Sequence, residues 1–224
     1  LRYYLTTNMP EGRDSDWDWQ EFLNRNNNEL VATWGNLANR VLAFAYKHWE
    51  GRVPAPDALG ANDHEILALV DSGFQSVGQH LDGVRLRAAL NESLRLSSEI
   101  NTYLEHSAPW TAIKVNRSGA ATSIYTALQA INSLKVLFAP FLPFSSERLH
   151  SYLGYSQPLF GEQYLETVLD DLGEHSVLRY RTASSSGRWE PARLPPGGTL
   201  REPAPLFRKL DDSMGEAERA RLGL

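Results

Sequence analysis

The chain has no cysteine among its 224 residues, so it can have neither a disulfide nor a thiolate ligand for zinc. Its six histidines are scattered, and none forms the H-x3-H pair that is typical of metal sites. No stretch approaches the roughly 20 apolar residues that a membrane-spanning helix needs. A glycine-rich phosphate loop and a nucleophile elbow are also absent. These absences favour a globular domain without a metal, a membrane span or recognisable catalytic machinery.

Positive charge is scarce as well, because 22 lysines and arginines face 27 aspartates and glutamates, for a net charge of −5. A protein that coats nucleic acid through general electrostatics normally has a basic surplus. If this chain binds RNA, it must do so with a few well-placed side chains. The first residue is not methionine, and the opening segment is too short and too polar for a secretory signal. We interpret the chain as a piece cut from a longer protein.

Amphipathic periodicity predicts four long helices and a short one. The first has an apolar stripe with 4-3-4-3 spacing, and Asp18 is expected to cap its start. The stripe consists of Leu30, Trp34, Leu37, Val41 and Phe44. The expected helices cover residues 18–49, 62–81, 84–108, a segment around 124–138, and 146–152. Because such helices cannot bury their stripes alone, we expect them to pack as an antiparallel bundle, which makes the fold all-α.

The helical pattern stops after residue 159. Val177–Arg181 alternates like one short strand, and the segment 184–205, rich in serine, glycine and proline, predicts an extended arm. The charged segment 211–224 is expected to form a frayed helix. We therefore divide the chain into a linker at 1–17, a helical bundle at 18–159 and an extended C-terminal arm at 160–224.

Asn36 and Arg40 lie one turn apart on the flank of the first predicted helix, beside its apolar stripe. Their neighbours on this flank are small or basic, namely Ala32, Ala43 and Lys47. An amide offers a donor and an acceptor to a base edge, and a guanidinium can also stack on a base. The flank therefore has the groups needed to read a nucleotide. The same pair is also typical of a helix face that simply meets solvent.

Trp110 follows Pro109 at the end of the third predicted helix, where an indole can present its face to solvent. Any base can stack on such a face, with a gain of ~1–3 kcal/mol. The alternative is that the indole caps the core of the bundle. The other indoles have packing roles in this interpretation: Trp34 in the core, Trp17 and Trp19 at the start of the first helix, Trp49 over the loop after it, and Trp189 as an anchor of the arm.

Five parts of the chain carry motifs in a fixed order. They are Leu1–Leu5 with Arg13–Asp16, Asn28–Val31 with Gly35–Arg40, Ala108–Trp110, Leu137–Pro143, and Pro205–Phe207. In order and spacing they resemble the bacterial-type methionyl-tRNA synthetases, which are class I aminoacyl-tRNA synthetases. The resemblance covers nearly the whole chain. It implies the helical anticodon-binding part of such an enzyme, with an extended closing segment.

The resemblance implies roles for the residues at matching positions. In that family an Asn and an Arg one turn apart, together with the Trp of an A-P-W turn, read the CAU anticodon. Asn36, Arg40 and Trp110 occupy these places, and Pro109 supports the indole. Some members have a further Asn where this chain has Ala32, so we do not expect that contact here.

The resemblance also implies the wider function. The partners would be the anticodon loop of tRNA(Met) and a catalytic domain of the same cytoplasmic protein, which would ligate methionine to tRNA with ATP and Mg. The H-I-G-H and K-M-S-K-S signatures of that domain do not occur in this chain, for which we expect no cofactor. The alternative, from another class, is a helical protein-interaction module that docks through Trp189 and the arm.

Overall fold

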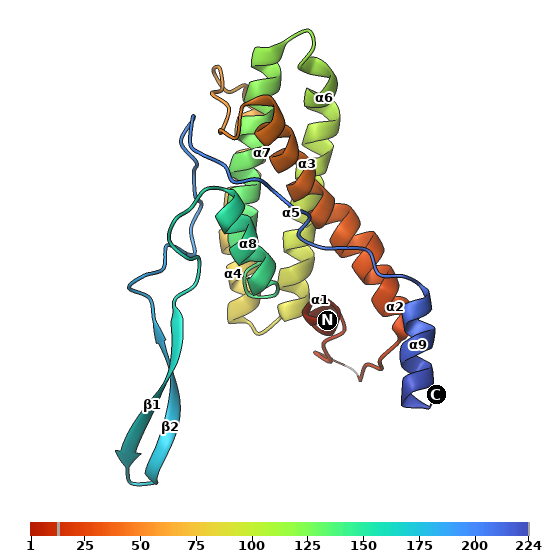
Figure 1. Ribbon diagram of the computed structural model, residues 1–224, viewed down its shortest axis with the longest axis vertical. Helices are drawn as coiled ribbons and strands as arrows, with labels where there is room; N and C mark the ends of the chain where they lie inside the picture. The colour runs from red at the N-terminus through yellow and green to blue at the C-terminus, as the bar shows by residue number, and fades with distance from the viewer. Residues whose placement is uncertain (13, 224) are drawn as a thin grey trace.

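The computed structural model describes residues 1–12 and 14–223, and it shows a helical bundle from which a hairpin projects (Figure 1). Arg13, part of the 13–16 motif, and Leu224 lie outside the described residues. The long helices are α3 (Asn36–His48), α4 (Ala61–Asp82), α5 (Leu86–Ser107) and α7 (Arg117–Leu137). The shorter ones are α1 (Arg2–Thr7), α2 (Trp19–Asn24), η1 (Arg25–Gly35), α6 (Pro109–Ala112), α8 (Pro143–Tyr152) and α9 (Ser213–Leu222). The predicted helical bundle is confirmed.

The first predicted helix is continuous from Trp19 to His48, but its type changes along its length. The carboxylate of Asp18 caps it, as predicted, by accepting a hydrogen bond of 2.6 Å from the backbone N–H of Glu21. Between α2 and α3 the backbone forms the π-helix η1, in which hydrogen bonds reach back five residues. A π-helix has more residues in each turn than an α-helix. The side chains of α2 therefore point in other directions relative to those of α3 than they would in one uninterrupted α-helix.

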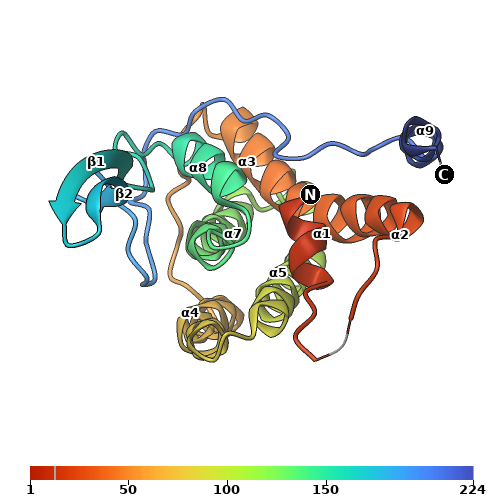
Figure 2. The ribbon, with the colours of Figure 1, turned by 90° about the horizontal axis from the view of Figure 1, so that it is seen from below.

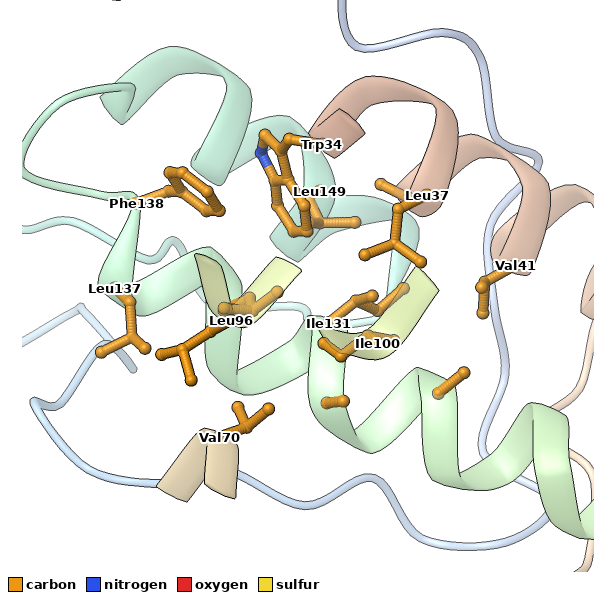
Figure 3. Close-up of a cluster of buried hydrophobic side chains, with 14 of the residues drawn as sticks. Trp34, Leu37, Val41, Val70, Leu96, Ile100, Ile131, Leu137, Phe138 and Leu149 are labelled. Carbon is orange, nitrogen blue, oxygen red and sulfur yellow. The ribbon is translucent and has the colours of Figure 1, made fainter. Parts of the chain in front are cut away.

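The apolar stripe of the first helix forms one wall of the core (Figure 3). Its first four members are buried, and Phe44 at the end is half-buried. Trp34 stacks on Phe138 at the end of α7, with ring centroids 4.7 Å apart. The facing walls contribute Val70, Leu96, Ile100 and Ile131. Burial of each such side chain stabilises the fold by roughly 1.5–3 kcal/mol, so this core fixes the orientation of α3.

Helix α4 begins one residue earlier than predicted and lies unusually close to its neighbours. The backbone N–H of Gly60 donates a hydrogen bond of 2.8 Å to the Asp63 carboxylate at the start of α4. In the middle of the helix, a Cβ at Gly73 would lie 2.5 Å from Leu96 of α5 and 2.9 Å from Leu137 of α7. A side chain at this position would therefore force the buried Leu96 and Leu137 side chains to shift, and glycine lets α4 pack against both helices without that shift.

Helix α7 carries polar residues into the interior, among them Lys135, which is 1% exposed. Its ammonium donates a hydrogen bond to the amide oxygen of Asn132 and lies 4.3 Å from the centre of the Tyr155 ring. His150 of α8 stacks on the same tyrosine, with centroids 4.0 Å apart. No described carboxylate forms an ion pair with this lysine, and burial lowers the pKa of Lys135 to about 7.

The strand predicted at Val177–Arg181 belongs to a longer strand that has a partner. Strand β1 (Glu162–Asp170) pairs antiparallel with β2 (Gly173–Arg181). In this register Leu165 lies opposite Leu178. The hairpin points away from the helices (Figure 1). The arm region thus has two strands where the sequence predicts one.

After the hairpin the chain is extended, as predicted for the arm, and it runs along the bundle, a path that the sequence did not predict. The side chain of Trp189 donates a hydrogen bond of 3.0 Å to the carbonyl oxygen of Phe74 in α4, and the two rings meet edge to face. Leu210 exchanges hydrogen bonds of 2.8 and 2.9 Å with the side chain of Asn27 in η1. Helix α9 then lies beside α2, apart from the bundle (Figure 2). The arm buries the side chains of Leu194, Leu200 and Leu206.

Candidate functional site

The flank of α3 that carries Asn36 and Arg40 is open to solvent. Both side chains are exposed, and so are Ala32, Ala43 and Lys47 on the same flank. Asn36 is the first residue of α3, directly after η1, and Arg40 follows one turn later. Within the described part of the chain the Asn36 amide makes no hydrogen bond. Its donor and its acceptor are therefore free for a ligand.

Trp110 stands on a turn whose backbone is set by the two preceding residues. Helix α5 ends at Ser107, and the left-handed conformation of the next residue, Ala108 (φ 40°), redirects the chain. Pro109 occupies the first position of α6, where its fixed φ suits a helix start and its missing N–H costs nothing. Pro109 is buried and Trp110 is half-buried. The proline thus anchors the turn, and the indole reaches the surface.

The fold brings Arg40 and Trp110 into contact. The guanidinium carbon of Arg40 lies over the indole, 4.6 Å from the ring centroid. Phe44, one turn further along α3, packs against the same indole at 4.9 Å with an interplanar angle of 84°. Asn36 lies one helical turn from this pair, on the same flank. The indole is therefore neither sealed inside the bundle nor remote from the α3 flank.

This surface is locally positive although the chain is negative overall. Residues 36–49 and 109–117, which form it, contain four lysines and arginines and no aspartate or glutamate. Burial, together with the positive charges of Lys47 and Arg117, lowers the pKa of His48 between them. A locally positive surface of this kind favours the approach of phosphates. The four cations are Arg40, Lys47, Lys114 and Arg117.

Sequence reasoning missed part of this surface. It assigned Phe44 to the core and Trp49 to the cover of a loop, and it did not single out Arg117. In the structure the Arg117 guanidinium lies over Trp49, with its carbon 5.4 Å from the ring centroid. The available signal was the presence of Phe44, His48 and Trp49 at the end of the helix that carries Arg40.

The site is an open surface and not an enclosed cavity. A cavity of about 610 Å³ lies between the start of α4 and the end of α5, where Asp63 and Tyr103 line it, and it excludes Arg40 and Trp110. Within 1–12 and 14–223, no three His, Asp or Glu residues are grouped so that they could hold a metal. In the same residues no helix is long and apolar enough to cross a membrane. The groups at the surface are suited to binding.

Comparisons with known proteins point to one family. Residues 53–180 match the family described as the anticodon binding domain of methionyl tRNA ligase, and residues 1–42 match class I tRNA synthetases (M). The chain is 50% identical, over 224 residues, to a methionine–tRNA ligase of Thermomicrobium roseum. It is 47% identical, over 223 residues, to one of Chloroflexus aurantiacus. Each alignment covers 99% of this chain but only 38% and 37% of the respective ligase.

The fold is similar to that of solved methionyl-tRNA synthetases. The apo form of the Mycobacterium tuberculosis enzyme superposes with a TM-score of 0.77 at 24% identity. The superposition covers 94% of this chain and 38% of that enzyme. The bundle, the hairpin and the arm thus correspond to a little over a third of the Mycobacterium tuberculosis enzyme.

Proposed function

Since the chain belongs to the family of methionyl-tRNA ligase anticodon-binding domains, we propose that it recognises the CAU anticodon of tRNA(Met). Asn36, Arg40 and Trp110 are the reading residues in this proposal, and Pro109 holds the indole at the surface. The observation that carries it is the 4.6 Å contact of Arg40 with Trp110. This contact places a guanidinium, which can donate hydrogen bonds to a base, beside an indole on which a base can stack. Both groups lie on an open, positive surface, as recognition of single-stranded RNA requires.

An unstacked base would enter at the face of Trp110 that Arg40 occupies in the free protein. Stacking on the indole is worth ~1–3 kcal/mol. The displaced guanidinium keeps its five donors within reach of a base edge or a phosphate. Asn36, one turn away, would pair its amide with a base edge. A wrong base leaves such a group unpaired, at a cost of about 1–3 kcal/mol per contact, and this cost provides the discrimination.

We propose for the chain the division into a linker at 1–17, a bundle at 18–159 and an arm at 160–224. The family match at 53–180 falls mainly on the bundle. Helix α1, inside the proposed linker, buries Tyr3 and Tyr4, and the arm returns to α4 through Trp189. Linker and arm are thus tied to the bundle, which would act as a rigid ruler between the anticodon and a catalytic domain.

The longer enzyme in this proposal is a cytoplasmic methionine–tRNA ligase that uses ATP and Mg. Its support is that the similar proteins are named methionine–tRNA ligases. One similar solved structure, from Mycobacterium tuberculosis, is described as bound by methionyl-adenylate. For the residues of this chain we propose RNA binding alone, with no cofactor and no catalysis.

The test is a titration with two RNA hairpins that differ only in the loop triplet, CAU or another. The wild-type chain should bind the CAU hairpin more tightly. Asn36→Ala should remove most of this preference. Trp110→Ala should abolish it while the bundle stays folded, as thermal unfolding would show, because without the indole no base is held against Asn36 and Arg40 for its edge to be read. Asn62→Ala, at an exposed asparagine in the first turn of α4, is the matched control and should change neither affinity. Equal wild-type affinity for both hairpins contradicts the proposal.

The alternative of a protein-interaction module depends on Trp189 and the arm as the docking element. In the structure Trp189 binds the carbonyl oxygen of Phe74 in its own bundle, and the arm buries its leucines there. The proposed docking element is thus engaged within the chain. The same titration separates the two functions, since a protein-interaction module should bind neither hairpin specifically.

A further inference from the structure

A second pair of an arginine and a tryptophan lies beside the proposed reading site. Trp49 closes α3, and Arg117 opens α7. The guanidinium carbon of Arg117 lies 5.4 Å from the Trp49 ring centroid, and its Nη2 donates a hydrogen bond of 2.5 Å to the carbonyl oxygen of His48. This pair repeats the arrangement of Arg40 on Trp110. In both pairs one helix supplies the ring and another supplies the cation.

Phe44 connects the two pairs into one surface. Its ring centroid lies 4.9 Å from that of Trp110 and 6.0 Å from that of Trp49. His48 packs against Phe44 at 4.3 Å. All four rings are half-buried, so each presents part of its surface to solvent. The two indoles are therefore neighbours separated by a single aromatic ring, and one unstacked strand can reach both.

We propose that Trp49 and Arg117 form a second nucleotide subsite, which binds a nucleotide of the anticodon loop outside the triplet. The inference rests on the proposed function and extends it. The base of this nucleotide stacks on the Trp49 indole, and its phosphate pairs with the Arg117 guanidinium. Stacking accepts every base, and phosphates carry no sequence information. The subsite therefore adds affinity and no discrimination.

The charges around Arg117 favour a ligand over a purely structural role. Arg117 is exposed and forms no ion pair with any residue that the structure describes. Asp57, in the loop after α3, accepts a hydrogen bond from Ser118 and not from Arg117. The segments 36–49 and 109–117 contain no acidic residue, and Glu50, which is exposed and directly follows Trp49, forms no ion pair with Arg117. Apart from the Nη2 bond to the His48 carbonyl oxygen, the N–H groups of this guanidinium form no hydrogen bond with the residues that the structure describes. They are held over the indole in advance for a phosphate, which pairs with a planar cationic fork.

A purely structural role makes a different prediction. If Arg117 only fastened the start of α7 to the end of α3, its loss would lower stability and leave the RNA affinity of the folded chain unchanged. Binding must therefore be measured beside unfolding. The probes are the CAU hairpin and the hairpin with a different triplet, each titrated into the full chain at several salt concentrations.

Trp49→Leu should lower the affinity of the chain for both hairpins by the same factor, about 5- to 150-fold. The ratio of the two affinities should therefore stay at its wild-type value. Arg117→Gln should also weaken both, and it should lower the slope of log affinity against log salt by about 0.7. Trp189→Leu removes a partly exposed indole from another part of the surface. It is the matched control, and both affinities should stay at the wild-type value.

Abasic substitutions identify the nucleotide. An abasic residue is placed in turn at each loop position outside the triplet. At one of these positions the abasic residue should lower the affinity for the wild-type chain. The same RNA should bind the Trp49→Leu chain no more weakly than the unmodified hairpin does, because the two changes remove the same contact. If Trp49→Leu does not fold, Trp49→Phe and Arg117→Gln take its place in this cycle.

Two results overturn the subsite: folded Trp49 and Arg117 variants that bind both hairpins like the wild type, or a loss confined to one hairpin. A wild-type chain that binds both hairpins equally overturns the CAU reading instead. The two failures are thus distinguishable, since one concerns the effect of the variants and the other the preference of the unaltered chain.

Discussion

Replacing Lys135 with methionine should stabilise this domain, and more strongly at about pH 6 than at about pH 8.5. The lysine is 1% exposed. Its ammonium donates a hydrogen bond to Asn132 and lies over the ring of Tyr155. Methionine fills a similar space and carries no charge that must leave water. The perturbation therefore removes a desolvation cost and little packing.

The magnitude follows from the pKa of this lysine in the two states. Burial lowers the pKa of Lys135 from 10.5 to about 7. Between these values the unfolded chain binds a proton that the folded chain does not, so stability rises with pH across this window. At about 1.4 kcal/mol per unit, the cost of burial is about 5 kcal/mol at pH 6 and about 3 kcal/mol at pH 8.5. The lost hydrogen bond offsets about 1 kcal/mol, which leaves gains of about 4 and about 2 kcal/mol.

The assay is urea denaturation of the wild type and the variant at both pH values, with the free energy of unfolding taken from linear extrapolation. Comparison at each pH cancels the contributions of all other titrating groups. Lys209→Met, at an exposed lysine of the arm, is the control and should change the free energy by less than about 0.5 kcal/mol. A Lys135→Met chain that is no more stable than the wild type at pH 6, or whose gain does not shrink at pH 8.5, refutes the reasoning.

Two further predictions concern the core and the arm. Trp34→Ala should lower the free energy of unfolding by about 3–5 kcal/mol, because Trp34 is 1% exposed and stacks on Phe138; a urea midpoint equal to that of the wild type would contradict this. Trp189→Ala should release the arm from α4, so limited proteolysis should cut within 184–205 faster than in the wild type; an unchanged rate would mean that other contacts hold the arm.

The helices were predictable because their signals are local. The spacing of the apolar stripe from Leu30 to Val41 and the cap at Asp18 act within a few residues, and both appear in the structure as predicted. The π-helix η1 was not predictable in this way, since a wheel of 100° per residue assumes regular α-geometry. The tail 208–210 lies against this segment, where Leu210 pairs with Asn27, a contact across the whole chain.

Strand β1 shows where pattern reading fails. Its residues, from Glu162 to Asp170, place polar side chains on both faces, so the alternation that reveals Val177–Arg181 is blurred. The strand is defined by its partner, through the antiparallel register with β2. A two-stranded pairing of this kind is a property of two segments together, and neither segment carries it alone.

For the candidate site, periodicity placed Asn36 and Arg40 on one flank, and the A-P-W turn put Trp110 at the end of a helix. The spacing could not predict that these two places meet, because Trp110 follows Arg40 by 70 positions in the chain, with the helices α4 and α5 between them. The same holds for the contact of Arg117 with Trp49.

The amino-acid sequence alone determined the helices, the cap at Asp18 and the polar flank of α3, because each of these features depends on residues within one or two turns of one another. Packing decided the rest. It laid Arg40 over Trp110, set Arg117 on Trp49, and enclosed Lys135 where no described carboxylate forms an ion pair with it. These outcomes depend on how α3, α5 and α7 fit against one another, and that fit is a property of side-chain volumes from the whole molecule.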